Sequence, residues 1–207
     1  MHILYEDDHL LAVFKPAGLA SVPSPNIPET KTLQGNLRAW AESEQKGFKP
    51  YLLNRLDRET SGIVLAGKFP RDREALEGIF QDAQTQKIYL ALVKGIPKKS
   101  KGIITIPLEA RTAHKKVPAT THYAVIERFR SVSLLEVRIE TGRKHQIRQH
   151  LKMIGHPLLL DSMYGDKNFN YQYKKEFPKA HMVLHAAEMR FRHPFTKAMV
   201  KVQAELP

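Results

Sequence analysis

Short apolar runs and alternating apolar residues, both typical of β-strands, recur along this chain. Strands are predicted on both sides of a polar turn at Glu6–His9 and over residues 63–68, 86–94, 120–130, 132–140, 184–194 and 199–206. Proline and glycine interrupt the loop that begins at Lys15 and continues through Pro28. The pattern therefore predicts many short strands, several of which are neighbours in the sequence.

Helical spacing of apolar residues marks three segments between these strands. Helices are predicted over Thr32–Glu44, Pro70–Gln81 and Arg143–Ile154. No element is predicted for the polar and aromatic stretch Lys167–Lys179. Interleaved strands with few helices predict an α+β fold built on a mostly antiparallel sheet. A length of 207 residues fits a single domain over residues 1–207.

The charge balance indicates a polyanionic partner. Thirty-three Lys and Arg residues against twenty-one Asp and Glu residues give a net charge of +12. A membrane surface is the alternative polyanion, but membrane binding calls for an amphipathic basic helix, and the basic residues here are scattered along the chain. We therefore expect a nucleic acid as the partner and no membrane association.

Cysteine is absent, which excludes disulfides, thiolate metal sites and a cysteine nucleophile, and which suits a reducing cytosol. Residues Met1–Lys15 lack the basic segment and apolar run of a signal peptide. No stretch of the sequence approaches membrane-spanning length. We expect a cytoplasmic protein.

The segment NRLDRETSG carries the first candidate for catalysis. Asp57 lies between Arg55 and Arg58, and neighbouring guanidinium groups favour the ionised form of a carboxylate. Such an anion is suited to nucleophilic or general-base chemistry. A surface loop with solvated ion pairs explains the same charges equally well.

The segment TGRKHQIRQHL supplies cations along the third predicted helix and the turn before it, at Arg143, Lys144, Arg148 and Lys152. This helix can contact phosphates. The alternative is a solvated helical face, but such a face usually carries acidic partners at helical spacing, and these are missing here. Tyr89 lies on a predicted strand, where its ring could stack on a base. The position by itself favours a core residue.

Metal and nucleotide-cofactor sites are not expected. His181 and His185 have the spacing of a helical zinc site, but His185 begins a strand-like segment and no glutamate follows His181 as a zinc-protease motif requires. The sequence also lacks a phosphate-binding loop, a dinucleotide fingerprint and the nucleophile motif of hydrolases.

Taken together, the segments NRLDRETSG, KIYLALVKG, TGRKHQIRQHL, GHPLLLDSMYG and LHAAEMRFRHP resemble, in order and spacing, the RluA-type family of RNA pseudouridine synthases. The matching pattern runs from about Ile3 through Pro194. The resemblance implies a mixed, mostly antiparallel central sheet with flanking helices and loops and a basic central cleft. It also implies that a uridine in rRNA or tRNA is isomerised to pseudouridine without a cofactor or metal.

The resemblance further implies a role for individual residues. Asp57 matches the catalytic aspartate of the family, and Arg148 matches the arginine that pairs with it. Tyr89 matches the tyrosine that packs against the target uracil, which reverses the preference for a simple core residue. Arg55 matches an arginine that enters the RNA stack when the uridine flips out, and Ile147 matches an apolar position of the base pocket.

Two features depart from the family pattern. Asn54 stands where the family usually has histidine. We also expect a catalytic domain without the S4-type RNA-binding domain of many relatives. A monomer is expected. The alternative function is a non-catalytic RNA-binding or RNA-chaperone module on the same fold; a nuclease is weaker because no carboxylate cluster for divalent metals is visible.

Overall fold

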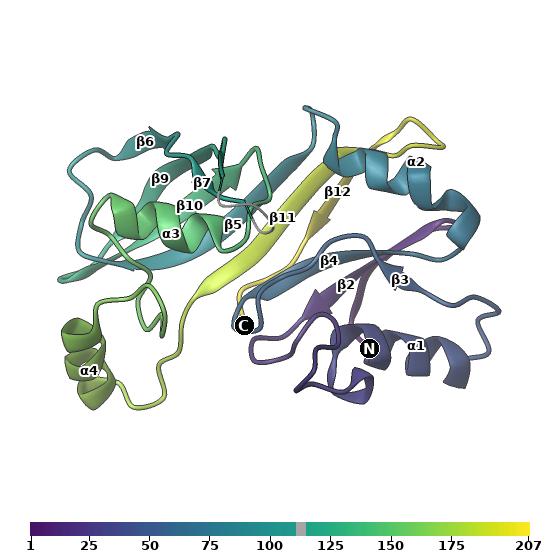
Figure 1. The fold of residues 1–207 in the computed structure, drawn as a ribbon, viewed down its shortest axis with the longest axis horizontal. Helices are drawn as coiled ribbons and strands as arrows, with labels where there is room; N and C mark the ends of the chain where they lie inside the picture. Colours follow the sequence, from purple (N-terminus) through teal and green to yellow (C-terminus); the bar gives the residue numbers. More distant parts are fainter. Residues whose placement is uncertain (111–114) are drawn as a thin grey trace. The chain divides into compact units, whose positions relative to one another are not determined.

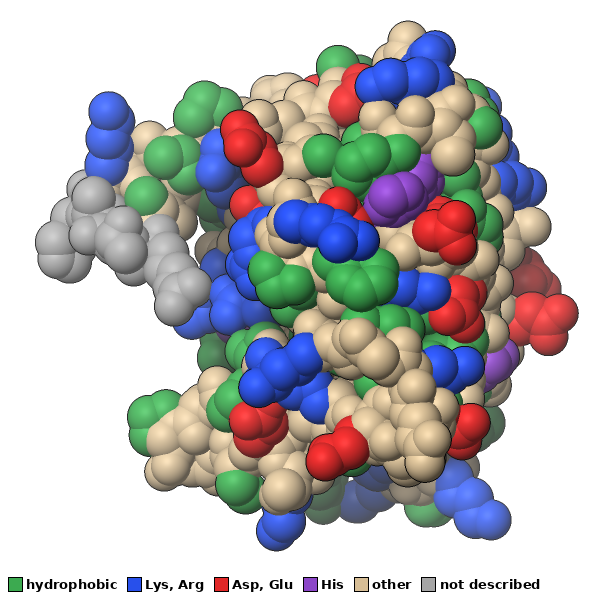
Figure 2. Space-filling model, turned by 90° about the vertical axis from the view of Figure 1, so that its right-hand side faces the viewer, with side chains coloured by type: hydrophobic (Ala, Val, Ile, Leu, Met, Phe, Trp, Pro, Cys, Tyr) green, Lys and Arg blue, Asp and Glu red, His purple; other side chains and the backbone are tan. Residues whose placement is uncertain are grey.

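The structure is a computed structural model that describes residues 1–110 and 115–207. It consists of two compact units (Figure 1): unit 1 contains Met1–Gln86 and Ala186–Pro207, and unit 2 contains Lys87–His185. On the face drawn in Figure 2, Lys and Arg side chains are interleaved with Asp and Glu instead of forming one basic patch. No helix in the described ranges combines the length and apolar character needed to cross a membrane.

Unit 1 is built on antiparallel strands. Its strands are β1 (Ile3–Glu6), β2 (Leu10–Lys15), β3 (Tyr51–Leu52), β4 (Ser61–Gly67), β12 (Met199–Gln203) and, from Ala186 onward, β11 (Leu184–Arg192). Strand β2 pairs with β1 and β4, and β3 pairs with β4, while β12 pairs with β11, all antiparallel. Strand β4 is also a neighbour of β11. Every residue of β4 is buried, which fits its nearly continuous apolar sequence.

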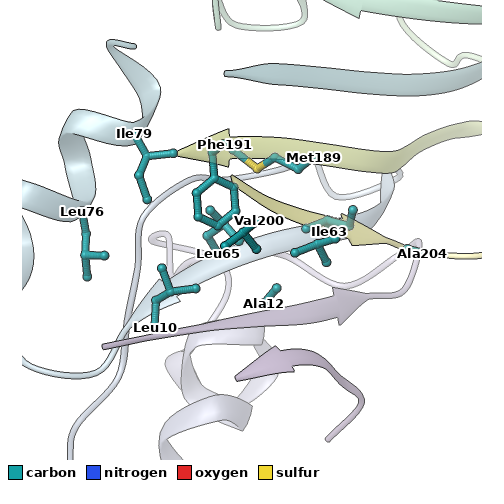
Figure 3. Packing of buried hydrophobic residues seen from close by; sticks show 11 residues of the cluster. Leu10, Ala12, Ile63, Leu65, Leu76, Ile79, Met189, Phe191, Val200 and Ala204 are labelled. Carbon is teal, nitrogen blue, oxygen red and sulfur yellow. The ribbon is translucent and has the colours of Figure 1, made fainter. Parts of the chain in front are cut away.

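The core of unit 1 lies between these strands and the helical segment after β4. Leu10, Leu65 and Phe191 are fully buried there, and Leu76 and Ile79 pack against them from the helical segment (Figure 3). Unit 1 also contains helix α1 (Leu33–Ser43) and the short helices η1 (Glu29–Lys31), η2 (Pro70–Asp72), α2 (Arg73–Glu77) and η3 (Gly78–Phe80). The predicted helix 70–81 is thus three short pieces; the last begins at Gly78, a residue of low helix propensity.

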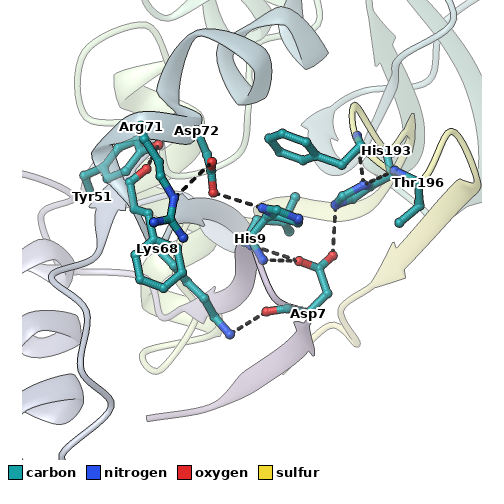
Figure 4. A network of polar contacts seen from close by, with 11 residues as sticks. Asp7, His9, Tyr51, Lys68, Arg71, Asp72, His193 and Thr196 are labelled. Atoms are coloured by element: carbon teal, nitrogen blue, oxygen red, sulfur yellow. Dashed lines mark hydrogen bonds and ion pairs between the residues drawn. The ribbon is translucent and has the colours of Figure 1, made fainter.

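A polar network fixes the turn between β1 and β2 (Figure 4). This turn lies beside the C-terminal end of β4, whereas Asp57 precedes the N-terminal end of that strand. Asp7 Oδ1 accepts hydrogen bonds from His9 N at 2.8 Å and Leu10 N at 2.9 Å. Burial raises the pKa of Asp7, but these amides outweigh it and the pKa lies below its ordinary value. His193 Nε2 lies 3.1 Å from Asp7 Oδ2, and His9 Nδ1 lies 2.9 Å from Asp72 Oδ2. These histidines therefore anchor turns.

Unit 2 is a second antiparallel arrangement. The strands β5 (Gln86–Lys94), β10 (Val132–Ile139), β9 (Thr121–Arg128) and β6 (Lys101–Ile104) lie in that order, and β7 (Leu108–Glu109) pairs with β8 (Lys116–Val117). Helix α3 (Gln146–Met153) packs against these strands through Ile147 and Leu151, which share a core with Val93 and Leu135. Helix α4 (Lys167–Glu176) follows.

The α+β fold with mostly antiparallel strands is confirmed in each unit, and the predicted strand 86–94 has the bounds of β5. The prediction of one domain over residues 1–207 stays a prediction. The helix predicted from Arg143 begins only at Gln146, because His145 adopts a left-handed conformation with φ of 53°. Strands β3, β6, β7 and β8 and helix α4 were not predicted. These four strands have two to four residues each, too few for a periodic pattern.

Candidate active site

Asp57 lies in the loop between β3 and β4 of unit 1, and its side chain is partly exposed. The loop turns immediately after it, where Thr60 N donates to Asp57 O at 3.1 Å. At the start of β4, Gly62 has a φ of 113°, and a Cβ there would lie 2.3 Å from Ala186 O. Only glycine lets β4 approach β11 this closely directly behind the loop.

Ser21 holds the backbone just before Asp57. Its Oγ donates to Leu56 O at 2.7 Å and accepts from Leu56 N at 3.1 Å, and both residues are buried. A single side chain thus satisfies both polar backbone groups of Leu56. The position of the Asp57 backbone is therefore determined by a residue 35 positions earlier in the chain than Leu56.

Lys15 holds the backbone just after Asp57. Its side chain is fully buried at the end of β2, and Nζ donates to Pro16 O at 2.9 Å, Leu19 O at 2.7 Å and Arg58 O at 3.0 Å. Burial lowers the pKa of Lys15 to about 8, although the carboxylates of Glu59 and Asp57 act in the opposite direction.

Arg58 and Gly18 close the same region through two further hydrogen bonds. Gly18 N donates to Arg58 O at 2.8 Å, and Arg58 Nε donates to Gly18 O at 2.9 Å. The loop after β2 and the Asp57 loop therefore form one hydrogen-bonded unit. Sequence reasoning missed Lys15 and Ser21; the only signal was a lysine at the end of the apolar run LLAVFK.

Asn54, which departs from the family pattern, has a structural role. Its Oδ1 accepts from Leu65 N at 2.7 Å, next to the hydrogen bond from Leu53 N to Leu65 O at 2.8 Å. The side chain thereby ties the loop to β4 before the chain reaches Asp57. Arg55, the next residue, is exposed.

Arg148 is held by a buried ion pair in unit 2. Its Nε and Nη2 donate to the two carboxylate oxygens of Asp161 at 2.7 and 2.9 Å. Asp161 also accepts from the backbone amides of Met163 and Tyr164 at 2.8 and 2.9 Å. Burial raises the pKa of Asp161, but the Arg148 hydrogen bonds and these amides outweigh burial, so the pKa lies below its ordinary value.

The basic face predicted for the third helix needs a correction at Arg148. Arg143, Lys144 and Lys152 are exposed, whereas Arg148 is only 6% exposed. Its acidic partner, Asp161, comes from a loop 13 residues later, so inspection of helical spacing could not find it. A guanidinium buried beside a carboxylate is oriented by it and is not part of a solvated face.

Two further polar residues of the same motif fix α3 against β9. Gln146 Nε2 donates to Thr120 O at 2.9 Å and to Thr121 Oγ1 at 3.0 Å. His150 lies with Nδ1 2.9 Å from Thr121 Oγ1 and Nε2 2.8 Å from Ile106 O. Burial lowers the pKa of His150, which favours the neutral ring. Both residues therefore position the helix that carries Arg148.

Tyr89 and Ile147 are both associated with the core of unit 2. Ile147 is 5% exposed and belongs to the buried cluster of this unit, and Tyr89 is partly buried against the same cluster. Unit 2 thus contains Tyr89, Ile147 and Arg148, while unit 1 contains Arg55 and Asp57. The assembly of the two groups into one active site stays a prediction.

The two histidines that were weighed as zinc ligands lie in different surroundings. His185 is fully buried in β11, and His181 is exposed in the preceding loop. Among the described residues, no group of three His, Asp or Glu side chains is arranged to hold a metal ion.

The family of the chain follows from a comparison of its sequence with models of known protein families. Residues 9–153 match the family model described as RNA pseudouridylate synthase. The chain belongs to this family. The family inferred from the sequence motifs is thereby confirmed. The role of each residue stays a prediction.

Curated relatives and a solved structure agree with this membership. The chain is 34% identical, over 99% of its length, to ribosomal large subunit pseudouridine synthase C of Vibrio vulnificus, and covers 65% of that protein. It is 32% identical, over its whole length, to ribosomal large subunit pseudouridine synthase D of Zymomonas mobilis, and covers 69% of it. The chain thus spans about two thirds of these relatives.

Human RNA Pseudouridylate Synthase Domain Containing 4 has a similar fold. Its TM-score is 0.82 at 24% identity, with all of this chain and 88% of the human chain covered. At this level of identity the similarity supports the fold only.

Proposed function

We propose that this protein is an RNA pseudouridine synthase in which Asp57 is the catalytic residue. The observation that carries the proposal is the position of Asp57 in the family motif, on a loop whose backbone is held before it by Ser21 and after it by Lys15. A partly exposed carboxylate on a fixed backbone is accessible to substrate and yet restricted in position.

The reaction is an isomerisation, so no atom is gained or lost overall. The bond between C1′ and N1 of a uridine breaks, the uracil turns while it is held, and C1′ joins to C5; C5 loses its proton and N1 gains one, so the atoms balance. Asp57 acts either as a nucleophile at C1′ or as a base that removes the 2′ proton. Both routes need a carboxylate near the ribose, and neither calls for a cofactor.

The remaining residues act on the substrate or on Asp57. Arg148 pairs with the carboxylate of Asp57, and its five N–H donors allow this in addition to the bonds with Asp161. Tyr89 and Ile147 line the base pocket from the core of unit 2. Arg55, which is exposed, enters the RNA stack when the uridine flips out, because a planar cation can both stack and bind phosphate.

The substrate is RNA, and the net charge of +12 favours binding of a polyanion. The relatives named above are ribosomal large subunit synthases, which favours a uridine of large-subunit rRNA; a tRNA uridine is the second possibility.

The experiment is pseudouridine mapping of total RNA by carbodiimide primer extension in cells that contain the wild-type protein, Asp57→Asn or neither. We expect sites that appear only with the wild-type protein, because an amide can neither attack C1′ nor accept the proton. Full modification by Asp57→Asn would contradict the assignment.

RNA binding by Asp57→Asn, measured in parallel, is the control for folding. Absence of every wild-type-specific site, together with intact RNA binding, would favour the non-catalytic RNA-binding module instead.

A further inference from the structure

Helix α4 differs from α1 and α3 because none of its residues is buried. Figure 1 shows it apart from the strands of unit 2 and from α3, between two connecting loops. The Asp166 side chain caps it by accepting from Phe169 N at 2.9 Å, and Asp166 also forms an ion pair with Lys94. The helix is therefore held by specific polar contacts and not by a buried apolar face.

One side of α4 is anchored to unit 2. Asn170 Oδ1 accepts from Leu160 N at 2.9 Å, and Asn170 Nδ2 donates to Asp161 O at 3.3 Å. The rings of Phe169 and Tyr173 are stacked, with centroids 6.1 Å apart. Because Asp161 also binds Arg148, these contacts connect α4 with the residue proposed to pair with Asp57.

Another side of α4 carries Lys167, Tyr171, Lys174 and Lys175, which we call the basic face of α4. At 3.6 residues per turn these four positions fall within an arc of about 100°. All four are exposed, and Tyr171 is 60% exposed. Lys175 Nζ lies 4.6 Å from the centre of the Tyr171 ring.

The composition of the basic face is unlike that of an ordinary solvated helix, on which opposite charges alternate and pair. Among the described residues, the ion pairs include no carboxylate partner for Lys167, Lys174 or Lys175. Lys174 instead donates to Ala180 O. The surface in Figure 2, by contrast, mixes both signs.

Charge complementarity favours RNA as the occupant of the basic face. Three lysines on one side of a helix match a phosphate backbone, and an exposed aromatic ring among them offers a surface on which an unpaired base can stack. A membrane is disfavoured because the face has no aliphatic residue to insert between lipids.

We propose that the basic face of α4 binds the phosphate backbone of the substrate RNA and that Tyr171 stacks on one of its unpaired bases. The proposal rests on the proposed function, which makes RNA the substrate. It assigns part of RNA recognition to a helix that is joined to Arg148 through Asn170 and Asp161.

The test uses the full chain and a fluorescein-labelled single-stranded RNA of mixed sequence, about 20 nucleotides long, titrated at several salt concentrations. The variant Lys167→Gln/Lys174→Gln/Lys175→Gln removes the charges and retains good helix formers. Each phosphate contact contributes about 0.7 to the slope of log affinity against log salt for single strands, so we expect the slope to fall by about 2. Affinity at low salt should fall at least about tenfold.

The control is Lys98→Gln/Lys99→Gln/Lys101→Gln, which removes the same charge from exposed positions around the β5–β6 connection. We expect its affinity to change by less than about twofold and its slope by less than about 0.5. Equal losses in the two triple variants would overturn the proposal, because affinity would then follow net charge alone.

Tyr171→Leu tests the stacking surface without a change of charge. We expect affinity to fall about tenfold with an unchanged salt slope. An affinity equal to that of the wild type would overturn the role of Tyr171. Thermal unfolding midpoints equal to the wild type would show that the variants are folded.

Pseudouridine formation on total RNA is measured separately with the same proteins. If the wild type binds the labelled RNA through the basic face of α4 but forms no pseudouridine, the proposed function fails and the RNA-binding role of the basic face stands. If the wild type forms pseudouridine and the triple lysine variant of α4 binds RNA as tightly as the wild type, the RNA-binding role of the basic face fails and the proposed function stands.

Discussion

The Asp57 loop and helix α3 both carry a proposed active-site residue, but they hold it by different means. The backbone around Asp57 is fixed by Ser21 and Lys15, whose side chains bond to backbone groups. Arg148 is fixed through its own side chain, by the buried carboxylate of Asp161. A loop without strand pairing needs partners for its backbone, whereas a helix satisfies its own backbone and needs a partner only for the buried charge.

The largest effect is expected at the ion pair. Asp161→Ala removes both carboxylate hydrogen bonds that hold the buried Arg148 guanidinium, which should lower the free energy of unfolding by about 3–5 kcal/mol. Urea unfolding measures this change. Glu77→Ala, which removes the exposed partner of Arg73, is the control and should cost about 0.5 kcal/mol or less. Similar decreases in the free energy of unfolding in both variants would mean that the Asp161–Arg148 pair contributes no more to stability than a surface ion pair.

The next effect concerns the pH dependence of the Lys15 anchor. The pKa of Lys15 is about 8 in the folded protein and 10.5 ordinarily. Between these values the unfolded chain binds more protons, so the free energy of unfolding rises with pH through this window. The difference between the two pKa values of Lys15, 10.5 and about 8, corresponds to a change of about 3 kcal/mol in the free energy of unfolding across this window.

Urea unfolding of the wild type and of Lys15→Met from about pH 7.5 to about pH 10 isolates this contribution. Other groups, such as Tyr5, whose burial raises its pKa to about 12, titrate in both proteins and cancel. A difference between the two proteins that stays constant with pH would mean that Lys15 does not titrate in this range.

A smaller effect is expected for Ser21→Ala. The change leaves the N–H and C=O of Leu56 without their partner, which should cost about 2 kcal/mol of stability. Because the backbone before Asp57 loses its anchor, the single-turnover rate of pseudouridine formation should fall while RNA affinity stays the same. A fall in affinity with an unchanged rate would place Ser21 in RNA binding instead.

The smallest effect is expected at Asn54. Asn54→Ala removes the acceptor of Leu65 N and should cost about 1 kcal/mol, measured by urea unfolding. Asn54→His, which restores the residue usual in the family, supplies a ring nitrogen that can accept the same N–H. We expect its stability to lie within about 0.5 kcal/mol of the wild type. A loss as large as that of alanine would show that histidine needs a different local backbone.

Apolar patterns and sequence motifs were enough to predict the longer strands, the family and the candidate residues. Strand β5 and helix α1 follow from apolar periodicity within about one residue, because their buried faces repeat along a continuous segment. The motif around Asp57 identified the proposed catalytic loop through residue types alone.

The hydrogen-bond and ion-pair partners of these residues follow from the fold and not from the local sequence. Ser21 and Leu56 are 35 positions apart, Lys15 and Arg58 are 43 positions apart, and Arg148 and Asp161 are 13 apart, so local spacing could not connect them. The same is true of α4, whose residues are anchored by Asn170 and Asp166 without any buried apolar face. Periodicity reports which residues avoid water, whereas these side chains are placed by hydrogen bonds and charges that depend on the folded chain.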